Sequence, residues 1–94
     1  MVNLDDVIAW ENGKMSDEQE RKFFQKIVNT GEVWHLQGIY GRRAYDLMNS
    51  GEIDYPKKKT YDAYGNPIPT QADIKRQFKE YVPASKRRKL KEVS

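Results

Sequence analysis

The chain has 94 residues, which suits one domain, and its 37% hydrophobic and 33% charged residues predict a small core with a solvated extension. The absence of cysteine excludes disulfide bonds and thiolate metal sites, and a single histidine leaves only carboxylates for a metal. No apolar run approaches the roughly 20 residues of a membrane span, so we expect no membrane partner and a cytoplasmic protein.

Charge is unevenly distributed between the two halves of the sequence. Residues 1–53 contain six Lys/Arg against nine Asp/Glu, a net charge of −3. Residues 54–94 contain eleven Lys/Arg against five Asp/Glu, a net charge of +6. This asymmetry predicts an acidic helical body that carries a basic C-terminal extension.

Two helices are predicted near the N-terminus from their capping residues. The first begins after Asn3, a good N-cap, and stops at Gly13, because glycine accepts the left-handed conformation that follows a helix. The second begins with a capping box, in which Ser16 is followed three residues later by Gln19, and it ends at Gly31. Its core side is predicted from four apolar residues at helical spacing: Phe23, Phe24, Ile27 and Val28.

A third helix is predicted over residues 32–50, with Leu36 in the core and Trp34 at its edge. Gly38 and Gly41 interrupt this helix, and each costs about 1 kcal/mol relative to alanine in a helix interior. We expect these glycines to allow the close approach of a neighbouring helix, with a bend near Gly38. The alternative is a clamp on a nucleic-acid backbone, as in the Gly-x-x-Gly loop of KH domains, but this half of the chain predicts none of the strands that such a loop requires.

The helical pattern is lost over residues 54–69, where proline, tyrosine and lysine are frequent. Proline disfavours the helical conformation of the residue before it, so this segment is predicted to be an irregular arm. The alternative is a short hairpin with a turn at Gly65-Asn66 and strands at Thr60-Tyr61 and Ile68.

A final amphipathic helix is predicted to begin at Thr70, which is followed three residues later by Asp73, and to present Ile74 and Phe78 on its apolar side. The like-charge block beyond it is expected to be disordered until it meets an anion. The predicted fold is all-α, with a three-helix bundle over residues 1–53, the arm over 54–69, the amphipathic helix over 70–83 and a disordered basic tail over 84–94.

The sequence contains no recognisable catalytic arrangement. No serine lies in a nucleophile elbow, no Walker-type phosphate loop is present, and His35 lacks companions at metal-ligand spacing. We therefore predict a protein that is not an enzyme, with no catalytic residue, no metal and no cofactor.

The strongest functional signal is the mixture of positive charge and tyrosine in residues 54–94, which is typical of DNA or RNA binding through counterion release and base stacking. The alternative is a protein-interaction module that binds a host or phage protein through Tyr40, Arg42 and the arm, with the tail serving only solubility. The predicted nucleic-acid contacts are Arg42, Arg43, Lys57, Lys58, Lys59, Lys75, Arg76, Lys79, Lys86, Arg87, Arg88 and Lys89.

Residues 34–42 form the motif Trp-x-Leu-Gln-Gly-x-Tyr-Gly-Arg, preceded by Thr30-Gly31. This pattern resembles small phage-encoded proteins in which a short helix and an acidic second helix precede the same motif. The resemblance covers residues 1–53 and implies a phage gene product that acts in a bacterial cytoplasm. The family that it resembles has no established activity, so the resemblance implies a context and not a mechanism.

Overall fold

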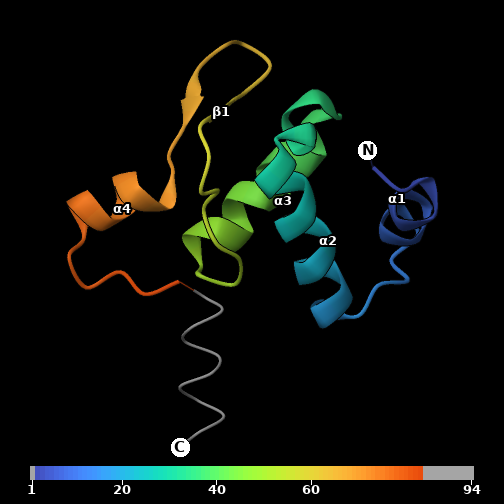
Figure 1. The fold of residues 1–94 in the computed structure, drawn as a ribbon. Helices are drawn as coiled ribbons and strands as arrows, with labels where there is room; N and C mark the ends of the chain where they lie inside the picture. The colour runs from blue at the N-terminus through green and yellow to red at the C-terminus, as the bar shows by residue number, and fades with distance from the viewer. Residues whose placement is uncertain (1, 84–94) are drawn as a thin grey trace, which may run out of the picture.

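The computed structural model describes residues 2–83, and this part of the chain is mostly helical (Figure 1). Three of its helices begin where capping residues predicted, after Asn3, Ser16 and Thr70. Asn3 accepts a hydrogen bond from the backbone of Asp5, and Ser16 and Gln19 form a reciprocal capping box. The elements are α1 (Leu4–Glu11), α2 (Asp17–Thr30), a 3-10 turn η1 (Glu32–His35), α3 (Gly38–Asn49), β1 (Thr60–Tyr61), β2 (Pro67–Ile68) and α4 (Gln71–Gln77).

The predicted third helix over residues 32–50 is in fact two elements. Gly31 ends α2 in the left-handed region, with φ at 82°, and starts η1, which stops at Leu36 in an extended conformation. This break changes which side chains face inward, so that Trp34 is 6% exposed while Leu36 is only partly buried. The prediction that Leu36 is buried and Trp34 lies at the edge was therefore wrong, because it assumed one continuous helical phase.

The two glycines at the start of α3 do not serve close helix packing. A Cβ atom on Gly38 would meet no atom within 4 Å. A Cβ atom on Gly41 would lie 3.7 Å from the ring of Trp34, which is an ordinary van der Waals contact. The expected bend near Gly38 is the break between η1 and α3, and the predicted packing role of these glycines is wrong.

One hydrophobic core joins the helices to the segment that follows them. Helix α1 buries no residue completely and packs through Val7 and Trp10, whose indole meets the ring of Phe24 edge-on at 5.1 Å between centroids. Ile53 and Ile68 are 2% and 1% exposed and belong to the same core. Their companions are Phe23, Phe24, Ile27, Val28, Val33, Trp34, Tyr40, Ala44, Leu47 and Met48.

The segment of residues 54–60 runs alongside the second half of α2. The side-chain amide of Gln25 accepts from the backbone N–H of Asp54 at 2.7 Å and donates to its carbonyl at 3.1 Å. At the other end, Thr60 packs so closely on Gly31 that a Cβ atom there would lie 3.2 Å from the Thr60 methyl carbon. The segment is therefore fixed to α2 at both ends.

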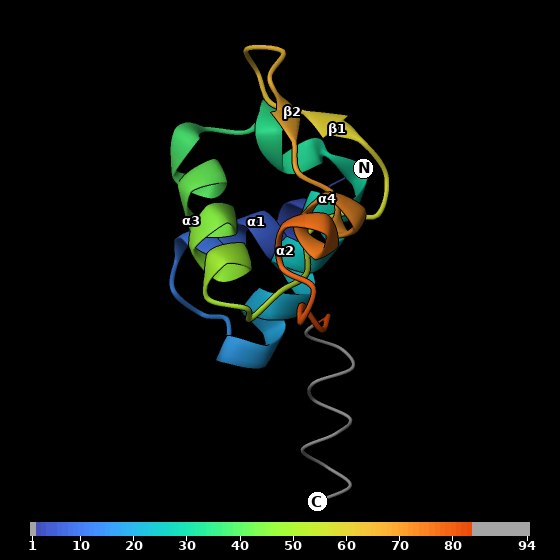
Figure 2. The same ribbon diagram turned by 90° about the vertical axis from the view of Figure 1, so that its left-hand side faces the viewer.

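Residues 60–68 form the hairpin that the sequence offered as the alternative to an irregular arm. Strands β1 and β2 pair antiparallel, with Thr60 opposite Ile68 and Tyr61 opposite Pro67. The hairpin loop projects beyond the helices (Figure 2). Its strands add a small sheet to the predicted all-α fold, because Ile68 reaches the core and Thr60 fits against α2.

Helix α4 begins at the predicted capping box of Thr70 and Asp73 but ends at Gln77, short of the predicted boundary at residue 83. Phe78, which follows it, is extended and 63% exposed. The backbone N–H and the side-chain amide of Gln71 hold the helix to the carbonyls of Pro56 and Tyr55, both at 2.9 Å. No helix within residues 2–83 is long and apolar enough to cross a membrane.

Candidate nucleic-acid interface

Adjacent arginines on α3 have different surroundings. Arg43 donates to both carboxylate oxygens of Glu20 on α2, from Nε at 3.1 Å and from Nη2 at 2.7 Å, and the indole N–H of Trp10 donates to the same carboxylate at 2.8 Å. The hydrogen bonds from Arg43 are the largest cause of the lowered pKa of Glu20, and they raise the pKa of Arg43 in turn. Arg43, a predicted nucleic-acid contact, thus joins α3 to α2 through Glu20.

Arg42, by contrast, is exposed on α3. Within residues 2–83 it forms no ion pair, so the local pair with Asp46 that helical spacing would allow is not formed. Among the described residues, therefore, no carboxylate occupies the guanidinium of Arg42, which can meet an anion.

A second pair of predicted contacts meets at one carboxylate. Lys59 lies 3.6 Å from Asp73, measured from Nζ to Oδ2, and Arg76 on α4 donates to the other oxygen of Asp73. Asp73 also caps α4, and the backbone N–H of Thr70 is the main cause of its lowered pKa. Lys59 therefore joins the segment before the hairpin to α4, whereas Arg76 pairs with Asp73 within α4. Both predicted contacts are thus engaged with a carboxylate of the protein itself.

Four of the remaining predicted contacts are exposed lysines without an acidic partner in the described part of the chain. Lys57 and Lys58 precede the hairpin, Lys75 lies on α4 and Lys79 follows it. The predicted contacts Lys86, Arg87, Arg88 and Lys89, and the predicted disordered tail, lie outside the described residues.

A group of cations on α2 was not predicted from the sequence, because the net charge of residues 1–53 is negative. Lys22 and Lys26 are exposed one helical turn apart, on the side of α2 opposite its apolar stripe. A surface hollow of about 460 Å³ is lined by Arg21, Lys22, Gln25, Lys26 and Asn29. Lys22 and Lys26 are four residues apart and lie opposite the predicted apolar stripe of this helix. This spacing was the signal that could have shown that they share its exposed side.

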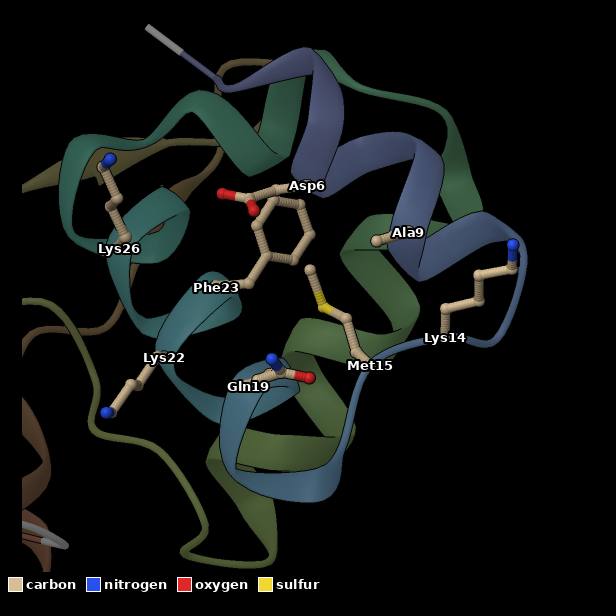
Figure 3. A pocket seen from close by; sticks show the side chains of 8 residues that line it. All are labelled: Asp6, Ala9, Lys14, Met15, Gln19, Lys22, Phe23 and Lys26. Carbon is tan, nitrogen blue, oxygen red and sulfur yellow. The ribbon is translucent and has the colours of Figure 1, made fainter.

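Lys22 and Lys26 also border a second hollow of about 330 Å³ between α1 and α2 (Figure 3). In this view they extend from α2 away from α1, whereas Lys14 lies at the far side of the hollow. Asp6 and Phe23 also line this hollow, and the view draws the carboxylate of Asp6 next to the ring of Phe23. The two lysines thus border both hollows. The hollow between α1 and α2 is lined by residues of both charges, whereas the hollow of about 460 Å³, which we call the cationic hollow, is lined by Arg21, Lys22 and Lys26.

The fold places the start of the segment before the hairpin beside the cationic hollow. Gln25 lines the cationic hollow and also binds Asp54, so the hollow borders the segment that leads to Lys57 and Lys58. An extended chain covers at most about 3.6 Å per residue, which keeps the backbone of Lys57 and Lys58 within roughly 11–14 Å of Asp54. We call Lys22, Lys26, Lys57 and Lys58 the cationic face. Only Lys22 among them has an acidic neighbour within residues 2–83, the exposed carboxylate of Glu18 at 3.5 Å.

Comparison with known proteins gives one match. The model of a protein family described as a domain of unknown function, DUF7417, matches residues 1–64. The match includes α1, α2, α3 and the first strand of the hairpin, and it therefore contains all four residues of the cationic face. Searches of curated proteins and of solved structures give no match.

Proposed function

We propose that this chain, which belongs to the DUF7417 family of domains of unknown function, binds nucleic acid and catalyses no reaction. In this proposal the cationic face makes the primary contact with phosphates, and Arg42, Lys75, Lys79 and the basic residues beyond residue 83 add to it. The resemblance to phage-encoded proteins would place this binding in the cytoplasm of an infected bacterium.

The observation that carries the proposal is that, within residues 2–83, some cationic side chains form ion pairs with carboxylates whereas others do not. The arginines that join elements of the fold are paired: Arg43 with Glu20 and, more weakly at 3.9 Å, Arg21 with Glu52. Lys26, by contrast, has no acidic partner within residues 2–83, and neither do Lys57, Lys58, Lys75 and Lys79. Exposed lysines that stabilise no other part of the fold are free to neutralise phosphates, and each such contact releases counterions.

A groove beside α4 favours a second candidate function, the binding of a protein. This groove has a volume of about 470 Å³, and Phe78 at its side is 63% exposed. Aromatic side chains of this kind are common anchors in protein interfaces. The apolar residues that line the groove are Met48, Tyr55, Ile74, Phe78, Tyr81 and Val82.

The proposal is tested by fluorescence polarisation of the full chain with labelled DNA and RNA oligonucleotides between about 50 and 200 mM salt. We expect binding that weakens with salt. Replacing Lys26, Lys57 and Lys58 together by glutamine should reduce the magnitude of the log–log salt slope by up to about 2.7 on duplex DNA, since each phosphate contact contributes about 0.9.

Single substitutions provide the matched comparison, because Lys14 is also an exposed lysine but lies across the α1–α2 hollow from the cationic face. Lys26→Gln should lower the slope by about one contact, while Lys14→Gln should leave it unchanged. Equal effects of the two would show that only net charge matters. Absence of salt-sensitive binding to any DNA or RNA would overturn the proposal and favour the protein-binding candidate.

A further inference from the structure

The tip of the hairpin holds an exposed tyrosine on an ordered turn. Within the loop, the backbone of Asp62 donates to the carbonyl of Asn66 at 2.9 Å and accepts from the N–H of Gly65 at 3.0 Å. One carboxylate oxygen of Asp62 also accepts from the backbone of Tyr64 and of Asn66, both at 2.9 Å. Gly65 supplies the left-handed residue of the turn, with φ at 82°. These bonds fix the backbone of Tyr64, while its side chain is 91% exposed.

The base of the same hairpin is held firmly by the rest of the protein. Ile68 is 1% exposed in the core, and Thr60 packs on Gly31 at the end of α2. A second aromatic ring, that of Tyr61 on β1, is 54% exposed. The hairpin, whose loop projects from the rest of the fold (Figures 1 and 2), therefore carries two exposed aromatic residues on an anchored support.

Lysines and aromatic rings are adjacent along this part of the chain. Lys57 and Lys58 of the cationic face come just before β1, and Tyr64 lies six positions after Lys58. At about 3.6 Å per residue the backbones of these two residues lie within roughly 22 Å of each other. Sites for single strands extend over about 4–16 nucleotides, so one strand can contact the lysines and reach the tyrosine.

We propose that the hairpin tip is a stacking site for unpaired bases, so that the ligand of the cationic face is single-stranded nucleic acid or an unpaired loop. This inference rests on the proposed function. Bases in a duplex are already stacked on each other, whereas an unpaired base gains from stacking on an exposed ring such as that of Tyr64. Isolated exposed aromatics are common on protein surfaces. Here two of them share an anchored hairpin that follows Lys57 and Lys58, which have no acidic partner within residues 2–83.

The experiment compares a single-stranded oligonucleotide of about 16 nucleotides with its duplex, using the full chain and polarisation over a salt series. Tyr64→Leu should weaken binding of the single strand about tenfold or more, leave duplex binding unchanged and keep the salt slope, because it removes a ring and no charge. Tyr64→Trp keeps a ring and should restore single-strand binding. A side chain that is 91% exposed is replaced in both variants, so a thermal melt should show that each folds as the wild type does.

Photo-crosslinking provides a second measurement. An iodouracil-substituted single strand should attach to the peptide that contains Tyr61 and Tyr64, and this product should be lost in Tyr64→Leu. Salt-sensitive binding with equal affinity for single strand and duplex, and with no effect of Tyr64→Leu, would overturn the stacking site while leaving the proposed function intact. Failure of the wild type to bind any nucleic acid would overturn both.

Discussion

Replacing Arg43 by glutamine should destabilise the protein without weakening its contact with phosphates. The guanidinium of Arg43 makes two of the three hydrogen bonds that the structure gives the carboxylate of Glu20, and Trp10 makes the third. In the variant the carboxylate, with a side chain only 16% exposed, loses both bonds from the guanidinium and keeps the bond from Trp10. Because the bonds from Arg43 join α3 to α2, their loss should act on the whole fold.

The magnitude follows from the burial of the pair. Hydrogen bonds to charged groups contribute about 1.5–3 kcal/mol when shielded, whereas exposed ion pairs contribute about 0–1 kcal/mol. The side chain of Arg43 is 39% exposed, so this pair falls between the two cases and its loss should cost about 1–2 kcal/mol. For a domain of this size, that cost corresponds to a fall in Tm of roughly 5–15 °C.

The dependence of this effect on pH has a definite sign. The pKa of Glu20 is lowered in the folded state, chiefly by Arg43, so the folded protein binds fewer protons at this carboxyl than the unfolded chain does. The stabilisation is therefore fully present above the ordinary pKa of 4.5 and is lost as the pH falls through the lowered pKa of the folded state. The difference in unfolding free energy between the wild type and Arg43→Gln should shrink over that acidic range.

The assay is a pair of thermal melts and urea titrations, with Arg42→Gln as the neighbouring control. Arg42 has the same charge but forms no ion pair within residues 2–83, so its replacement should change the unfolding free energy by less than about 0.5 kcal/mol. An Arg43→Gln protein that melts with the wild type but loses about one unit of salt slope on nucleic acid would refute the reasoning. Arg43 would then be a phosphate contact after all.

Three further predictions concern stability. Gly38→Ala should raise the unfolding free energy by about 0.4–1 kcal/mol in urea titrations, since the new Cβ atom meets nothing and the unfolded chain loses freedom. Gly31→Ala should lower it in the same assay, because the backbone there has φ at 82° and the new Cβ atom would press on Thr60 at 3.2 Å; a stable variant would contradict the close contact. Burial, and secondly the hydrogen bond to Glu11, raises the pKa of Tyr40 from 10.0 to about 12. The folded state therefore holds this proton more tightly than the unfolded chain does, and the free energy of unfolding should fall as the pH rises from 10.0 to about 12. Tyr40→Phe should be less stable at neutral pH but should lack this alkaline loss, and an unchanged pH profile would count against the burial of the hydroxyl.

The local elements of this fold could be predicted from the sequence where neighbouring residues decide them. The capping boxes at Ser16 and Thr70 each depend on a partner three residues away, and both are present. Interactions at such short range form in nearly any context, so the start of a helix can be identified without knowledge of the fold. The order of Trp34 and Leu36 could not be predicted in this way, because it depends on the break after Gly31 and on the packing of Trp34 against Gly41.

For the candidate site, the sequence by itself determined which cations exist and that most of them lie in the second half of the chain. Only the tertiary structure decided which of them are free. Arg43 meets Glu20 across 23 residues, and Lys59 meets Asp73 from a different element, whereas Lys26 and Lys57 meet no acid in the described part of the chain. The attraction between opposite charges weakens with the distance between them. For charges far apart in the sequence, that distance is set by how helices and segments pack, so no local sequence pattern can show which charges are paired.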